Sequence, residues 1–376
     1  MMTPKERLIA AIERRPTDRL PVATHHLISY FLNKYAGGMD GLEFHKTMGF
    51  DPIVWPWKFR PVKDQYRDEA TGLIASPEWE IETKPVEGYA YPTTRYTFHT
   101  PGGDLTSLLQ SNEITSWQLE PILKEPEDLD LIAQYAPHHH IDEDYVNSVA
   151  AEVGQDALVR GTVACFEPFG QPGCWQDLAC LYGIENLIMD TFDDPEWVHT
   201  ALKVLMERKK TFIRSLANTH YDIIELGGGD ASTTVISPRI FEEFVAPYDK
   251  ELTTLAHENN QRVVYHTCGG MMPILEKIAD LGVDAMETFT PISMGGDMRL
   301  AEAKERIGSR VCMIGSFDQG HCFIGCSEEE TRSMVRQCFR DAGENGGFII
   351  SPSDHFFDAD LNLIRAFTDE ARKCTY

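Results

Sequence analysis

The 376-residue chain lacks any apolar run close to the 18 or so residues that a membrane-spanning helix needs. It is charged from Lys5 onward and has no long apolar stretch at its start, so we expect no secretory signal and a cytoplasmic location. Positive charge is scarce, because 34 lysines and arginines stand against 59 aspartates and glutamates and give a formal net charge of −25. No cluster of lysine or arginine offsets this charge, which argues against nucleic acid and anionic membranes as partners.

Paired cysteines and nucleotide-binding glycine motifs are also missing. The nine cysteines are odd in number and irregularly spaced, which indicates free thiols with a metal ligand among them and no disulfide framework. No P-loop is present, and the Gly-Gly-Gly-Asp stretch at 227–230 does not have the GxGxxG spacing. These absences exclude a disulfide-stapled secreted protein and give no sign of a bound dinucleotide.

What the chain does have is a repeated order of strand, loop and helix. A capping box at Thr3 to Glu6 predicts a first helix that ends near Arg15. Eight strands alternating with helices favour a single-domain TIM-type (β/α)8 barrel over residues 1–376, although an open doubly wound α/β sheet has the same alternation. The predicted strands are 20–23, 52–55, 158–164, 222–226, 262–266, 284–289, 311–315 and 347–351.

Residues 76–120 interrupt this order. Runs such as 79–82 and 94–98 alternate between apolar and polar residues, and turn signals at 86–88 and 101–104 separate them. The pattern predicts a small antiparallel β insertion. By contrast, the three histidines at 138–140 precede an acidic segment, and we expect them to form a solvated surface run.

Polar side chains follow nearly every predicted strand, which is where barrel enzymes carry their chemistry. The most informative stretch is Tyr265 to Gly270, where His266 and Cys268 stand two apart at a strand end and so point to one face. Imidazole nitrogen and thiolate sulfur together suit Zn²⁺. The other candidates are His25, His26, Trp55, Trp57, Glu225, Asp230, Glu287, Asp354 and His355.

Several segments resemble the uroporphyrinogen decarboxylase superfamily, and the likeness covers most of the chain. That superfamily is built on a single barrel, so the resemblance implies the barrel and not the open sheet. The matching pieces are Lys5 to Arg7, Arg19 to Val22, Gly227 to Asp230, Ser237 to Pro238, Phe241 to Tyr248, Gly282 to Ala285, Lys304 to Gly308 and Ile314 to Asp318.

Within the superfamily the resemblance is to the cobalamin-dependent methyltransferase branch. The decarboxylases carry an arginine-rich motif after the first strand that grips propionates, whereas residues 23–30 here contain no arginine. The methyltransferases bind zinc through an HxC pair and a further ligand near the last strand. His266 and Cys268 match the pair, and Asp354 stands where the coenzyme M enzymes have a cysteine. His355, Glu287 and Cys312 remain alternatives for that third ligand.

The stretch from Tyr265 to Met272, together with Phe317 to Gly320, is most similar to the methyltransferase component of anaerobic O-demethylases. The resemblance implies transfer of a methyl group from an aryl methyl ether to cob(I)alamin, a corrinoid carried by a partner protein, with zinc activating the ether oxygen. We expect Asp230 and Glu287 to act as catalytic groups that orient the substrate or relay a proton. Substrate-binding roles are expected for Trp55, Trp57, His26 and Glu225.

Three other functions stay open at this point. The first is transfer in the reverse direction, from a methylcorrinoid to coenzyme M or a similar thiol. The second is a metal-free decarboxylase, and the third is a corrinoid-binding or chaperone-like protein without turnover. The identity of the methyl donor and the assembly, with a homodimer as one option, are likewise left open by the sequence.

Overall fold

Seven strands form one parallel sheet in the computed structural model, which describes residues 1–25 and 27–376. The segment around Val22 closes this sheet into a ring. It makes a parallel bridge with Ile350 on one side, and its carbonyl oxygen accepts the N–H of Asp51 (2.7 Å) on the other. The predicted (β/α)8 barrel is therefore confirmed. In sheet order the strands are β1 (Ile53–Val54), β10 (Leu158–Thr162), β11 (Ile223–Gly227), β12 (Val263–His266), β13 (Ala285–Thr288), β14 (Cys312–Phe317) and β15 (Phe348–Pro352).

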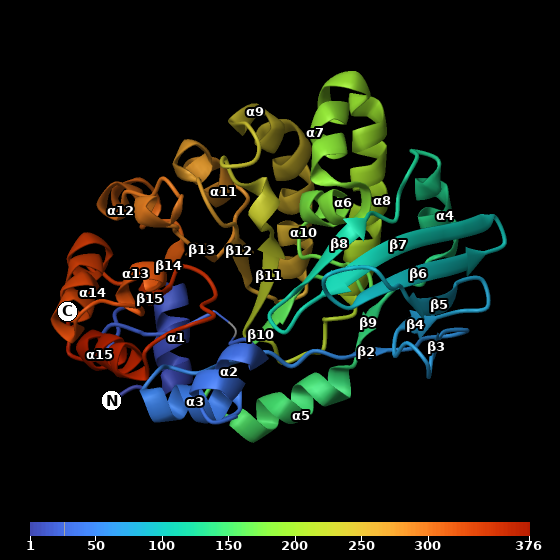
Figure 1. Ribbon diagram of the computed structural model, residues 1–376. Coiled ribbons are helices and arrows are strands. Elements are labelled where there is room, and N and C mark those ends of the chain that lie inside the picture. Colours follow the sequence, from blue (N-terminus) through green and yellow to red (C-terminus); the bar gives the residue numbers. More distant parts are fainter. Residues whose placement is uncertain (26) are drawn as a thin grey trace.

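Helices surround this barrel (Figure 1) and begin at the caps that the sequence predicts. Thr3 and Glu6 form the capping box of the first helix, which ends at Ile12 and not near Arg15 because Arg14 adopts a left-handed φ of 54°. Asp194 caps α8 by accepting the N–H of Trp197. The helices are α1 (Pro4–Ile12), α2 (Ser29–Tyr35), α3 (Gly41–Met48), α4 (Asp128–Tyr135), α5 (Glu143–Val153), α6 (Cys174–Tyr182), α7 (Ile184–Asp193), α8 (Pro195–Arg214), α9 (Pro238–Ile240), α10 (Ala246–Glu258), α11 (Leu275–Ala279), α12 (Leu300–Ile307), α13 (Gln319–Cys322), α14 (Glu328–Ala342) and α15 (Leu361–Ala371).

The predicted insertion is a four-stranded antiparallel sheet. It consists of β5 (Glu80–Pro85), β6 (Thr93–Thr100), β7 (Gly103–Ser111) and β8 (Ser116–Glu120). Trp79 joins it to the barrel, because its ring packs on Phe98 within the insertion and on Phe166 in the loop after β10. Two short antiparallel pairs lie nearby: β2 (Phe59–Arg60) with β9 (His140–Ile141), and β3 (Tyr66–Arg67) with β4 (Ile74–Ala75).

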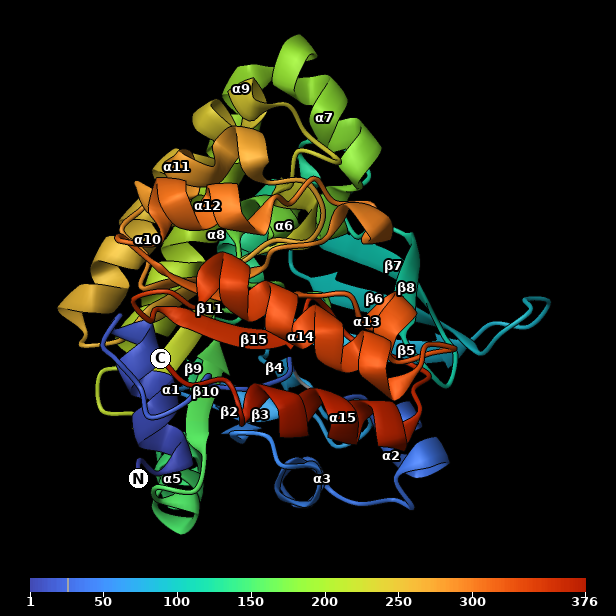
Figure 2. The ribbon, with the colours of Figure 1, turned by 90° about the vertical axis from the view of Figure 1, so that its left-hand side faces the viewer.

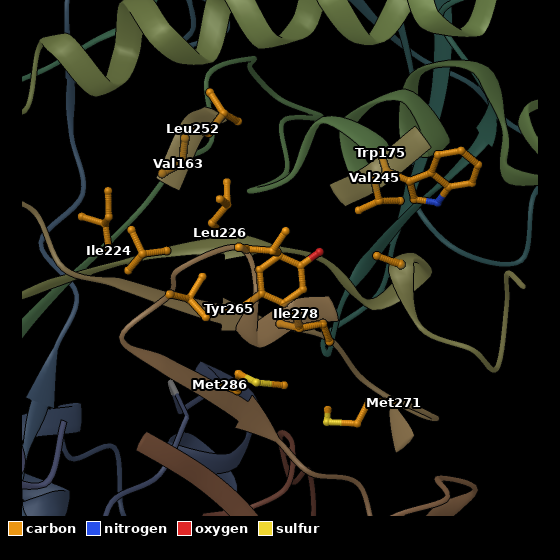
Figure 3. Close-up of a cluster of buried hydrophobic side chains, with 14 of the residues drawn as sticks. Val163, Trp175, Ile224, Leu226, Val245, Leu252, Tyr265, Met271, Ile278 and Met286 are labelled. Carbon is orange, nitrogen blue, oxygen red and sulfur yellow. The ribbon is translucent and has the colours of Figure 1, made fainter. Parts of the chain in front are cut away.

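Alternation along the strands creates two apolar layers. One face of each strand points outward to the helices, and Figure 3 shows part of this outer layer, where Ile224 and Leu226 of β11 and Tyr265 of β12 lie among helix side chains. The other face points into the barrel. Leu158, Ile223, Val264, Ala285, Cys312 and Ile349 form the inner layer.

Helix α1 closes one end of the barrel. Its Leu8, Ala11 and Ile12 belong to the same buried cluster as the inner layer. Near the end of the chain, α14 and α15 pack side by side (Figure 2), and α14 contacts β15. None of the helices in the described ranges has the length and apolar character that crossing a bilayer requires.

Candidate metal centre and adjoining cavity

Three side chains with metal-binding atoms meet at the carboxyl ends of the strands. His266 ends β12, Cys268 follows it on the same face, and Asp354 comes just after β15. His266 Nε2 lies 3.1 Å from Cys268 Sγ, and the same sulfur lies 3.1 Å from Asp354 Oδ2. Ligand atoms around tetrahedral zinc are about 3.5 Å apart when bonds are roughly 2.0–2.3 Å long. The nitrogen–sulfur and sulfur–oxygen distances are therefore compatible with donors that share one zinc ion.

Glu287 orients the imidazole of His266. His266 Nδ1 lies 2.7 Å from Glu287 Oε1, which directs Nε2 toward the sulfur. Burial disfavours the charged imidazole, but the adjacent Cys268 and Glu287 outweigh it and hold the pKa of His266 well above its ordinary value. Burial also raises the pKa of Cys268, an effect that the neighbouring His266 only partly counters. A cation that displaced these protons would find a thiolate and a neutral imidazole as ligands.

Arg160 joins the two glutamates inside the barrel. Its Nη1 donates to Glu287 Oε2 (2.7 Å) and its Nη2 to Glu225 Oε2 (2.8 Å), with a further bond to Glu287 Oε1. Burial opposes ionisation of Glu287, but the charge of Arg160 prevails and keeps the pKa of that carboxyl well below its usual range. The ring of Trp55 covers the guanidinium, whose carbon lies 4.2 Å from the ring centroid.

A second group of metal-competent side chains lies beside the first. One ligand atom each from His25, Glu225, His266 and Glu287 falls within 4.8 Å of the others. Both carboxylates of this group are bonded to Arg160, which competes with a metal ion for them. We expect a metal ion at His266, Cys268 and Asp354, and this site stays a prediction.

The remaining predicted residues lie at different distances from this centre. The carboxylate of Asp230 accepts a hydrogen bond from the side chain of Gln176 (2.7 Å). The turn that carries Asp230 also passes close to Cys268, since a methyl group in place of the Gly229 hydrogen would lie 3.9 Å from Cys268 Cβ. His355 Nε2 lies 3.9 Å from Asp354 Oδ1. Cys312 packs in the inner apolar layer with α1 and not beside the donors. His26 lies outside the described residues.

Two residues that the sequence patterns did not single out complete the site. Arg160 stands in the middle of an apolar strand, and a buried charge of that kind requires partners, which was a usable signal. Gln319 accepts the N–H of Ser353 (3.0 Å) and donates to the carbonyl oxygen of His355 (3.3 Å). It thereby holds the loop that carries Asp354, a long-range contact that no local pattern indicates.

A cavity of about 810 Å³ lies near this centre, and the described residues that line it do not include the three donors. It is bordered by α2, α3, the ends of β1 and β10 and the 166–170 loop, and both Trp55 and Trp57 line it. Trp55 connects the cavity with the metal centre, because the ring of His25 lies 5.3 Å from Trp55 and 5.0 Å from His266. The expectation of a solvated histidine run at 138–140 was wrong for His139, which is 4% exposed and packs on Phe59 beside this cavity.

Comparison with known proteins places the chain in a family. The family model described as "Uroporphyrinogen decarboxylase (URO-D)" matches residues 120–374, more than half of the chain. The chain belongs to the uroporphyrinogen decarboxylase family. The matched region contains Arg160, His266, Cys268, Glu287 and Asp354, whereas Trp55 and Trp57 lie before it.

Curated relatives and solved structures extend this result. The chain is 28% identical to the uroporphyrinogen decarboxylase of Trichodesmium erythraeum over 43% of both chains, and 23% identical to that of Crocosphaera subtropica over 68% of this chain and 70% of the relative. With the first of these relatives, and with a chloroplastic one from rice (49%), the match spans less than half of the relative's length. A "methyltransferase from Methanosarcina mazei" shares the fold over 99% of both chains, with a TM-score of 0.63 and 15% identity. A B12-independent methionine synthase from Shewanella has a TM-score of 0.51 at 11% identity, covering 94% of this chain and 98% of that one.

The role assigned to Glu287 in this family member leads to a first prediction. Glu287→Gln is expected to weaken zinc binding by about 10–100-fold, because the amide holds the His266 ring less firmly and makes it a poorer ligand. Competition with a zinc chelator measures the change. Glu251→Gln, on the exposed side of α10, is the control. Equal zinc affinity of the two variants would contradict this role.

Behind β12, a buried carboxyl is expected to make stability depend on pH. Tyr265 donates to Asp249 Oδ2 (2.8 Å), and burial raises the pKa of Asp249 from 3.8 to about 6. When the pKa of a carboxyl group is higher in the folded state than in the unfolded state, the group favours the fold at pH values below the unfolded pKa. That stabilisation is lost as the pH rises through the folded pKa. The full effect is about 3 kcal/mol, since one pKa unit is worth about 1.4 kcal/mol.

Asp249→Asn removes this titration. Between pH 5 and pH 8 the free energy of unfolding of the wild type is expected to fall by about 1 kcal/mol relative to that of the variant. Urea unfolding at both pH values measures the difference. If the free energy of unfolding of both proteins changes equally with pH, folding does not raise the pKa of Asp249.

Proposed function

We propose that this protein is a zinc-dependent, corrinoid-dependent methyltransferase that takes a methyl group from an aryl methyl ether. The acceptor is cob(I)alamin held by a partner corrinoid protein at the mouth of the barrel. The observation that carries the proposal is that Cys268 Sγ lies 3.1 Å from both His266 Nε2 and Asp354 Oδ2, near a cavity whose lining includes Trp55 and Trp57.

The chemistry requires help at the ether oxygen, because the leaving phenolate is basic. Zinc bound by His266, Cys268 and Asp354 would supply a Lewis acid for that oxygen. Glu287 keeps a proton on Nδ1 of His266, so that Nε2 faces the other two donors. Because Glu287 works through His266, we assign it a positioning role and not direct contact with the substrate.

The other residues would bind and orient the ring. Trp55 lines the cavity and packs on the guanidinium of Arg160, a contact that would hold its ring in place for stacking on an aromatic substrate. Glu225 supports this arrangement through its bond to Arg160. Asp230, fixed by Gln176 near Cys268, is proposed to orient the substrate or relay a proton at the rim.

The direct test is methyl transfer in solution. Purified protein, a panel of methoxyarenes and cob(I)alamin are combined, and the corrinoid absorption spectrum is followed. Methylation with at least one ether is expected, with loss after chelator treatment and recovery on adding zinc but not magnesium. An unchanged spectrum with every ether, together with methyl transfer from methylcobalamin to a thiol, would favour the reverse, coenzyme M type reaction.

Uroporphyrinogen decarboxylation is the second candidate, because the curated relatives carry that name. Its substrate bears propionate carboxylates, which require cationic partners. Residues 23–30 contain no arginine, and Arg160 is already bound to two glutamates. An assay with uroporphyrinogen and zinc-free protein separates the two functions, since turnover there would support the decarboxylase.

A further inference from the structure

The cavity beside the metal centre is walled mainly by apolar and aromatic side chains. Leucines of α2 and α3 form one wall, and Trp55, Trp57 and Phe59 form another. Among the described residues that border it, none is a lysine or an arginine. An organic ligand therefore finds stacking surface here and no fixed positive charge.

His45 is the unusual polar group of this cavity. It borders the cavity from α3, is 3% exposed, and neither of its ring nitrogens has a hydrogen-bond partner within the described ranges. Burial lowers the pKa of His45 to about 4, so the imidazole is neutral at pH 7. Buried polar groups are nearly always satisfied, so the imidazole of His45 is a position at which a bound ligand can supply the missing partner.

Glu167 is the acidic residue among the described residues that line the cavity. Its Oε2 accepts the N–H of Ile74 (3.0 Å) and lies 3.4 Å from Nε2 of His139. Burial lowers the pKa of His139, so this histidine does not cancel the carboxylate with a full positive charge. A second carboxylate entering the cavity would lose its hydration and meet a like charge.

We propose that this cavity binds an uncharged methoxyarene whose ring packs on Trp55 and Trp57 and whose hydroxyl group bonds to His45, and that it excludes rings bearing a carboxylate. The assignment rests on the proposed methyltransferase function, and it narrows the substrate class. A neutral imidazole accepts from a phenolic hydroxyl without a change in charge, whereas it gives a carboxylate no compensating cation.

Binding without any corrinoid tests this assignment. Guaiacol and vanillate, which differ by one ring carboxylate, are titrated into the zinc-loaded protein and followed by calorimetry. Guaiacol is expected to bind at least about tenfold more tightly than vanillate. His45→Phe and His45→Gln test the polar contact: the Phe variant should weaken guaiacol binding about tenfold, and the Gln variant should retain most of it.

Two further variants sharpen the result. Glu167→Gln should bring the affinity for vanillate closer to that for guaiacol, because the repelling charge is gone. His220→Gln, at an exposed histidine, is the matched control and should bind like the wild type. Equal binding of both ligands by the wild type, or unchanged guaiacol binding in His45→Phe, would overturn the assignment.

Methyl transfer from the same two ethers to cob(I)alamin separates the two proposals. Transfer from guaiacol alone supports both. Binding of guaiacol with the expected variant effects but without transfer refutes the methyltransferase and keeps the cavity assignment. Equal transfer from both ethers refutes the cavity assignment and keeps the methyltransferase.

Discussion

The Cys268→Ala variant is expected to lose its zinc and to transfer methyl groups about a thousandfold more slowly than the wild type. The sulfur would be the central donor of the proposed site, since it lies 3.1 Å from both the nitrogen of His266 and the oxygen of Asp354. Removing it leaves two donors for an ion that takes at least three from protein. A Lewis acid supplies several kcal/mol to such a reaction, and about 4 kcal/mol corresponds to a thousandfold in rate.

Metal analysis and the corrinoid assay measure the two effects together. Cys374→Ala is the matched control, because Cys374 is another partly exposed free thiol and lies near the end of the chain. We expect it to keep a single zinc ion per chain and full activity. If Cys268→Ala also retains that ion, the metal lies elsewhere, and the His25, Glu225, His266 and Glu287 group becomes the place to look.

The largest expected effect on stability comes from Arg160→Met. Arg160 is 3% exposed and bonds to both Glu225 and Glu287, so its loss leaves two carboxylates unpaired inside the barrel. Breaking a buried ion pair by removing one partner costs about 3–5 kcal/mol. Chemical denaturation should show a lower midpoint with an unchanged slope.

Two further measurements identify the cause of that loss. Without the guanidinium, the pKa of Glu287 rises in the folded state, so the deficit relative to wild type should shrink as the pH falls. The triple variant Arg160→Met with Glu225→Gln and Glu287→Gln should recover part of the stability, because no buried charge remains uncompensated. If the loss of stability is the same at every pH and is not reduced by replacing the two glutamates, its cause is the lost packing of the Arg160 side chain against Trp55.

The barrel could be read from the sequence because its signals are local. Each predicted strand is a short apolar run bounded by turns, and the observed strands fall within two residues of the predicted limits wherever the structure assigns them. Helix starts follow from Thr3 and Asp194, whose side chains cap the helices that come after them. The insertion follows from period-two alternation in the same way.

The site was predictable only in part. His266 and Cys268 lie two residues apart in the sequence, and the family resemblance pointed to Asp354. In the structure Cys268 lies close to both other residues. Zinc binding itself stays a prediction. Arg160 and Gln319 act on residues far away in the chain, so no local pattern gives their roles. The prediction of a solvated His139 was wrong for a related reason. The burial of this side chain against Phe59 depends on tertiary packing and not on its polar neighbours in the sequence.

Because α1 fills one end of the barrel, a small molecule would reach the proposed metal centre from the opposite rim. A macromolecule seated on that rim would also sit across the exit of any small molecule already inside. The kinetics should then be ordered: the ether enters first, the large acceptor docks second, and the demethylated phenol departs only after the acceptor has left.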